Sequence, residues 1–224
     1  MRRDFVEKWV GYWRMESKWA SPPYIAKDDL LLFEKCKIKY ETSVGFDGFL
    51  RSGLLYSEEP VVHAGLMPCP YLGDLRKAEV VVCLLKPGFG PIDYHAEDQE
   101  SFRKAVFANL VQRNQSVDYP FFALDPRFAW TGASRWWRRK LQPLIDVMTT
   151  KKGISTEDAF GILGRKMAAV ELVPCHLRPL IERDILLVLL FGRCGRLRLA
   201  GLTTEPGRDH ADLHFVLHQL VDRG

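Results

Sequence analysis

The stretch AEVVVCLLKPGFGPIDYHAED, residues 78–98, decides the fold. Its apolar run from Val80 to Leu85 is typical of a strand that is buried on both faces of a sheet. The next residues, KPGFGP, contain two prolines and two glycines and predict a tight turn. Acidic, aromatic and histidine side chains follow this turn at once. We therefore expect the end of this strand to form one wall of a functional site.

Helices and further apolar strands surround this stretch. Apolar residues at helical spacing predict helices, and short continuous apolar runs predict strands. The predicted helices are residues 3–17, 27–38, 97–114, 134–148, 155–167 and 208–221. The other predicted strands are residues 168–173, 185–191 and 197–202. Apolar strands separated by helices favour an α/β fold with a mainly parallel sheet that is covered on both faces.

Sheets of this kind bind their ligands beyond the carboxyl ends of the strands. Three turns follow predicted strands in this chain: residues 86–95, PCH at 174–176 and GRCGR at 192–196. We predict that the first turn forms the rim of a cleft within reach of His176.

The composition is that of an ordinary globular protein, with 47% hydrophobic and 27% charged residues among 224. No run of 18 apolar residues exists, and the first residues lack the features of a secretory signal. The five cysteines form no CxxC pair, a pattern that favours reduced thiols over disulfides, a zinc ribbon or an iron–sulfur cluster. We expect a cytoplasmic protein without a metal or cofactor and without a membrane anchor.

Several segments, taken in order, resemble the uracil-DNA glycosylase-like superfamily. The motif is KPGFGPIDYH at 86–95, with PYLGDLRKAEVVVCLL before it and DPRFAWTGASRWWRRKLQPLI and AAVELVPCH after it. Over roughly residues 60–180 this order is similar to a bacterial branch of the superfamily. The resemblance implies a three-layer α/β/α sandwich with a mainly parallel central sheet. Residues 1–224 would form a single such domain, with an N-terminal helical and loop extension at about 1–60.

The resemblance also implies a function, the hydrolysis of the N-glycosidic bond of a damaged or modified base in DNA. The target nucleotide is flipped out of the duplex into a pocket. In the superfamily a carboxylate or Asn before the motif's proline positions water, an aromatic ring stacks on the base, and an Asn at a later strand end reads the edge of the base. The alternatives are a non-catalytic nucleic-acid or nucleotide-binding module on the same fold, and a small-molecule binder that takes no DNA.

Lys86 occupies the water-positioning slot in this chain, and a protonated lysine cannot accept a proton from water. The acids and the histidine behind it, at 93, 95, 97 and 98, would then supply the acid and base chemistry. The predicted catalytic residues are Asp93, Lys86 and His95. The predicted substrate-binding residues are Phe89, which would stack on the base, together with Gly88, Tyr94 and His176.

Each of these assignments has a structural alternative. Lys86 and Asp93 would otherwise form a solvated ion pair, Phe89 would fill the core, and His176 would be a surface or capping residue. The base-reading position is a departure from the superfamily, because the chain holds only Asn109 and Asn114, both on a predicted helix. The strand AAVELV offers an acid, Glu171, instead.

Basic residues cluster in SRWWRRK at 134–140 and GRCGRLR at 192–198, although the net charge is only +4. Arginines neutralise phosphates and exposed aromatic rings stack on unpaired bases, so the first segment predicts a nucleic-acid contact, and a solvated helix face is the alternative. Adjacent helical residues point about 100° apart, so one of the two tryptophans should lie in the core. The predicted nucleic-acid-binding residues are Arg135, Trp136, Arg138 and Arg139.

The last predicted helix carries a histidine at every fourth position, His210, His214 and His218. The first and third would lie about 12 Å apart along a helix, too far for one metal ion with bonds near 2 Å. Packed or solvated histidines are therefore the favoured interpretation.

Overall fold

The computed structural model describes residues 3–14, 19, 21–25, 27–57, 61–114, 117–177 and 215–217. The chain is a mixed α/β protein, as its sequence predicts. The helices are α1 (Arg3–Trp13), α2 (Lys27–Lys35), α3 (Gly45–Arg51), α4 (Pro91–Asp98), α5 (Glu100–Leu110), α6 (Gly132–Lys152) and α7 (Thr156–Lys166), with short 3-10 turns at Leu54–Tyr56, Phe122–Leu124 and Pro126–Phe128. The strands are β1 (Tyr40–Glu41), β2 (Val62–His63), β3 (Tyr71–Leu72), β4 (Val80–Leu84), β5 (Met167–Glu171) and β6 (Phe215–Leu217).

The central sheet has the strand order β3-β5-β4-β6. Its two middle strands, β4 and β5, run parallel, with Val80 opposite Met167 and Leu84 opposite Glu171. The outer strands β3 and β6 pair antiparallel to them. In the central sheet, one of the three pairings between described strands is thus parallel, so a mainly parallel sheet is not confirmed. A second, two-stranded sheet joins β1 and β2 in parallel.

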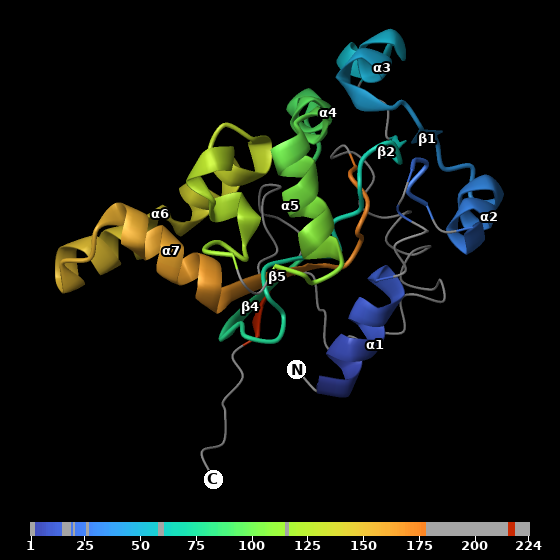
Figure 1. Cartoon of the computed structure of the whole chain (residues 1–224). Helices are drawn as coiled ribbons and strands as arrows, with labels where there is room; N and C mark the ends of the chain where they lie inside the picture. The colour runs from blue at the N-terminus through green and yellow to red at the C-terminus, as the bar shows by residue number, and fades with distance from the viewer. Residues whose placement is uncertain are drawn as a thin grey trace, which may run out of the picture.

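The helices lie around this sheet, with α6 and α7 together on one side in Figure 1, α2 and α3 on the other, and α4 and α5 between them. Most of the apolar helix faces bury side chains in one large cluster that includes Val106 of α5, Ile145 of α6 and Ala168 of β5. The predicted helix 155–167 is confirmed as α7, and its cap Ser155 accepts a hydrogen bond from the Asp158 N–H at 3.0 Å. A single core therefore joins the central sheet to these helices.

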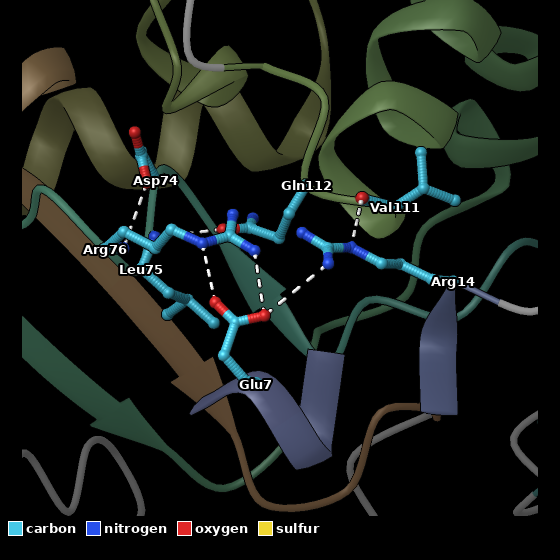
Figure 2. Close-up of polar contacts among 7 residues, drawn as sticks. All are labelled: Glu7, Arg14, Asp74, Leu75, Arg76, Val111 and Gln112. Atoms are coloured by element: carbon cyan, nitrogen blue, oxygen red, sulfur yellow. Dashed lines mark hydrogen bonds and ion pairs between the residues drawn. The ribbon is translucent and has the colours of Figure 1, made fainter. Parts of the chain in front are cut away.

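Helix α1 packs against the same core. Val6, Val10 and Trp13 are buried on one face, as the helical spacing predicts. On its polar side Glu7 binds Arg76, with Arg76 Nε donating to Glu7 Oε1 at 2.8 Å (Figure 2). Arg14 joins this contact, with its Nη1 3.5 Å from Glu7 Oε2, and its Nε donates to the Val111 carbonyl oxygen at 3.3 Å. The N-terminal helix is thus part of the main body rather than a detached arm.

Both asparagines of the chain, Asn109 and Asn114, lie in a buried cluster of polar side chains at the C-terminal end of α5, which we call the brace. Asn109 Oδ1 accepts from the Gly73 N–H at 2.9 Å, and Asn109 Nδ2 donates to the Tyr71 carbonyl at 2.7 Å. Asn114 Nδ2 donates to Asn109 Oδ1 and to the Pro120 carbonyl. Gln112 donates to the Gly73 carbonyl at 2.8 Å. It accepts from the Leu75 N–H at 3.1 Å (Figure 2). The brace ties the end of α5 to the connection between β3 and β4.

Gly73 is required in this brace. Its φ is +89°, a left-handed conformation, and a Cβ there would lie 2.6 Å from the Met167 carbonyl oxygen. A side chain would therefore be strained by its backbone and would clash with β5.

Two of the predicted helices differ in the structure. The single predicted helix 97–114 is two helices, α4 and α5, because Gln99 adopts an extended ψ of 116°. Helix α4 also begins inside the predicted turn, at Pro91, where a proline fits the first helical position. The predicted helix 208–221 is wrong where the structure describes it, since residues 215–217 form strand β6 beside β4. The predicted strands 185–191 and 197–202 lie outside the described residues.

Candidate functional site

The turn after β4 and the segment after β5 meet at one end of the central sheet. His176 Nδ1 donates to the Gly88 carbonyl oxygen at 3.0 Å, a contact between residues 88 positions apart. Lys86 Nζ donates to the Leu177 carbonyl oxygen at 3.3 Å. Both contacts lie at the carboxyl ends of the parallel strands β4 and β5, where open α/β sheets bind ligands. The predicted reach between the motif turn and His176 is confirmed at Gly88.

Asp93 lies at the third position of α4 and faces this meeting point. Its Oδ2 accepts from the Gly90 N–H at 2.7 Å, so it also caps the helix. A Cβ on Gly132, the first residue of α6, would lie 3.5 Å from Oδ1. Burial raises the pKa of Asp93, and His176, the Gly90 N–H and Arg135 oppose that rise by favouring the carboxylate. Asp93 thus has a nearby imidazole and guanidinium but is partly withdrawn from water.

Glu171, the last residue of β5, is a second acid at this end of the sheet. Its side chain is only 4% exposed, and burial raises its pKa to about 8, although Lys86 favours its charged form. Its Oε2 atom is buried and accepts no hydrogen bond from the described residues. Glu171 is absent from the predicted site residues, and its signal in the sequence is a lone acid within the apolar strand AAVELV.

A third acid, Glu97, lies one turn after Asp93 on α4. The Met67 N–H donates to both of its carboxylate oxygens, at 2.9 and 3.2 Å. Burial, with a smaller contribution from the nearby Asp93 and Asp98, raises the pKa of Glu97 to about 8, although the Met67 N–H and Arg103 oppose the rise. The Cys69 thiol lies within electrostatic reach of Glu171, Glu97 and Asp93, and burial and these three acids raise its pKa. Three carboxyl groups and a thiol therefore share one partly dry region.

Two predicted substrate-binding residues of the motif are packed against other side chains. Phe89 stacks on His63, with ring centroids 3.5 Å apart and planes 10° from parallel. Tyr94 is 1% exposed and stacks on Phe49 at 4.7 Å. Together Phe49, Leu66 and Tyr94 form a small separate core against which Phe89 lies. Tyr94 therefore belongs to the core, and one face of the Phe89 ring is covered.

His95 is not brought to Lys86 and Asp93. Residues two apart on a helix point about 200° apart, so His95 faces away from Asp93 toward the surface. There its ring lies between Phe46, at 5.6 Å, and Trp130, at 5.8 Å. These three rings form a surface row, which we call the aromatic row.

The predicted basic segment of α6 is only partly available at the surface. Trp137 is the buried member of the pair at 5% exposure, whereas Trp136 is half-buried with Lys140 Nζ 5.5 Å from its ring. The Arg138 guanidinium lies 4.3 Å from the Phe160 ring and donates to the Leu124 carbonyl, so it is used within the fold. Arg135 and Arg139 are exposed, and Arg135 is the one that acts on Asp93.

Asp98, another acid behind the motif, has a structural role. Its Oδ2 accepts from the Phe46 N–H at 2.7 Å and so caps α3 from outside, since Val44 provides no side-chain cap. Gly45 permits this close approach, because its φ is +69° and a Cβ would lie 2.7 Å from Asp98 Oδ1. Asp98 is therefore held by α3.

Within the described part of the chain, no group of three or more His, Cys, Asp or Glu side chains is arranged to hold a metal ion. The described cysteines are all free thiols: Cys36, Cys69, Cys83 and Cys175. No helix in these same ranges is both long and apolar enough to span a bilayer. The histidines 210, 214 and 218 and the basic segment 192–198 lie outside the described residues.

Comparison with known proteins adds no relative to this description. No family model, no curated protein and no solved structure matches the chain.

Proposed function

We propose that this protein is a uracil-DNA glycosylase-like hydrolase that cleaves the N-glycosidic bond of a damaged or modified base in DNA. The proposal includes the three-layer α/β/α sandwich with a mainly parallel central sheet. The observation that carries it is the contact between His176 and Gly88, which joins the motif turn to the segment after β5 at the ligand-binding end of β4 and β5. Asp93 lies beside that contact.

In this proposal the Asp93 carboxylate takes a proton from a water molecule. The water oxygen forms a bond to the sugar carbon, the bond from that carbon to the base nitrogen breaks, and its electron pair leaves with the base. A raised pKa makes the Asp93 carboxylate a stronger base than an exposed aspartate. His176 would stabilise the departing base or contact the sugar. Lys86, a donor with no lone pair when protonated, would hold an acceptor on the ligand.

Asp93→Asn tests the role of Asp93 directly. The amide oxygen of Asn can still accept from the Gly90 N–H, so the helix cap is kept while the basic carboxylate is lost. We expect base release to slow by at least about 100-fold, the contribution typical of a general base. The measurement is abasic-site formation in oligonucleotides that carry uracil, hypoxanthine or an oxidised base.

Lys86→Ala is the comparison at the motif: because it removes a ligand contact and not the base, it is expected to raise KM and to retain kcat for release, whereas Asp93→Asn lowers kcat. Asp93→Ala removes both the carboxylate and the helix cap, so the fall in its melting temperature measures how much the cap contributes to stability. Release at the wild-type rate in Asp93→Asn would reduce Asp93 to a helix cap. No release from any of these oligonucleotides by the wild-type protein would refute the hydrolase.

A second candidate function is a nucleic-acid-binding module without catalysis. The observation that favours it is the aromatic row of Phe46, His95 and Trp130, which lies at the surface, while the helix that follows Trp130, α6, carries the exposed Arg135. Exposed rings of this kind stack on unpaired bases, and arginines neutralise phosphates. This function predicts salt-sensitive binding to single-stranded or lesion-containing DNA with no base release.

Trp130→Ala is expected to weaken binding to a single-stranded oligonucleotide by about tenfold, because each base stacked on an aromatic ring contributes about 1–3 kcal/mol. Tyr40→Ala is the matched control, since Tyr40 and Trp130 are both aromatic and both 39% exposed, but Tyr40 lies outside the aromatic row. Fluorescence anisotropy at two salt concentrations measures both variants. Equal affinities for the two variants would remove the row from the binding surface.

A further inference from the structure

Glu171 carries a polar atom that the fold itself does not use. The residue is 4% exposed, and its Oε2 has no hydrogen-bond partner among the described residues. Buried polar side-chain atoms in folded proteins nearly always have a partner, so an unpaired carboxyl oxygen needs an explanation. One explanation is a bound ligand that supplies the missing hydrogen-bond partner.

Glu171 also lies on the side of the sheet where the candidate site is. In the parallel pair Glu171 is in register with Leu84, so Lys86, two residues further along, continues the same face. The charge of Lys86 favours the carboxylate form of Glu171. The charges of Glu171, Glu97 and Asp93 each raise the pKa of Cys69, so these groups lie near one another. The unpaired oxygen is therefore close to the motif turn.

We propose that the Glu171 carboxyl group forms the hydrogen bond that recognises the edge of the flipped base, with Oε2 as the contacting atom. This inference rests on the proposed function, because it names the base-contacting group of that same site. The class of base it fits presents a ring carbonyl oxygen, as uracil and hypoxanthine do.

The choice of a carbonyl follows from the protonation of the acid. Burial raises the pKa of Glu171 to about 8, with Lys86 in the turn after β4 opposing the rise. Other titratable groups in this region are Cys69 before β3, and Asp93 and Glu97 on α4. At pH 7 the carboxyl group mostly holds its proton and can donate it to an acceptor, whereas above pH 8 it is a carboxylate that can only accept.

The test compares binding of two single-stranded oligonucleotides that differ at one position. One carries uracil on a 2′-fluorinated deoxyribose, which keeps the N-glycosidic bond intact, and the other carries a tetrahydrofuran abasic analogue. The ratio of their affinities isolates the contact with the base. The full-length wild type is compared with Glu171→Leu and Glu171→Gln from pH 6 to pH 9, with melting curves to confirm folding. Glu157→Gln, an exposed acid on α7, is the control.

We expect the wild type to prefer the uracil oligonucleotide about tenfold at pH 7, as one hydrogen bond allows, and to lose that preference by pH 9. Glu171→Leu should show no preference. Glu171→Gln has a donor at every pH, so its preference should be retained and flat. A wild type without preference for uracil or hypoxanthine, a preference constant from pH 6 to pH 9, or a preference kept by Glu171→Leu would each overturn the inference.

This outcome is separate from that of the proposed function. A preference that depends on Glu171, with no release from natural uracil substrates, would leave the base contact standing and refute hydrolysis. If the wild type releases the base and Glu171→Leu still prefers the uracil oligonucleotide, hydrolysis would stand and the base contact of Glu171 would be refuted.

Discussion

Replacing Asn109 by Leu is expected to destabilise the protein by about 3 kcal/mol or more, because the change strands two buried backbone groups at about 1–3 kcal/mol each. The Gly73 N–H loses its acceptor and the Tyr71 carbonyl loses a donor. Asn109 is 2% exposed, so water cannot replace either partner. The loss should also reach Asn114, whose side chain donates to Asn109 Oδ1.

Urea unfolding measures this effect as a lower midpoint at an unchanged slope. The matched control is Gln142→Leu on α6, since the amide of Gln142 is exposed and binds Asp146 one turn away. That variant should differ from the wild type by no more than about 0.5 kcal/mol. An Asn109→Leu protein as stable as the Gln142→Leu protein would show that the brace contributes nothing, and would leave Asn109 available for another role.

The second large effect is on the pH dependence of stability. Glu171 titrates near 4.3 in an unfolded chain, whereas burial raises its pKa to about 8 in the folded protein. Between these values the folded state holds a proton that the unfolded state has released. The free energy of unfolding therefore falls as the pH rises from about 4.3 to 8, and the contribution of Glu171 is constant above and below this range.

Each pKa unit corresponds to about 1.4 kcal/mol, so Glu171 alone destabilises the protein at pH 8, relative to pH 4, by up to about 4 kcal/mol. Glu171→Gln mimics the neutral acid and removes this loss. We expect the variant to be more stable than the wild type at pH 8 and to have a shallower slope between pH 5 and pH 8. Some slope remains, because burial also raises the pKa of Glu97 to about 8.

Urea unfolding at pH 5, 6, 7 and 8 gives both slopes. Glu157→Gln, on the exposed side of α7, should keep the slope of the wild type. A wild-type stability that is constant over this range would mean that Glu171 is ionised in the folded protein. That result would also remove the donor on which recognition of a base carbonyl depends.

Local pattern was sufficient for most of the regular structure. The apolar run of β4, the amphipathic helices α1 and α5, and the Ser155 cap of α7 all lie close to where the sequence predicts them. These features depend on residues a few positions apart, whose spacing records which side of an element faces the core. The end of α4 was missed because Gln99 carries no strong breaking signal.

The meeting of the motif turn with His176 was also predictable, since the carboxyl ends of neighbouring parallel strands lie at the same edge of a sheet. The roles of individual side chains were not. Tyr94 fills a core, Asp98 caps α3, and Arg138 packs on Phe160, although all three stand in polar segments of the sequence.

The sequence by itself thus determined the α/β class, the positions of most described helices and the end of the sheet where the candidate site lies. Only the tertiary structure decided that both asparagines brace the core and that Glu171 is buried with an unpaired oxygen. The physical reason is the separation along the chain of the residues that interact. Periodicity reports contacts within one helix or strand, whereas the burial and pKa of a polar group depend on neighbours that are distant in the chain, such as Lys86 for Glu171.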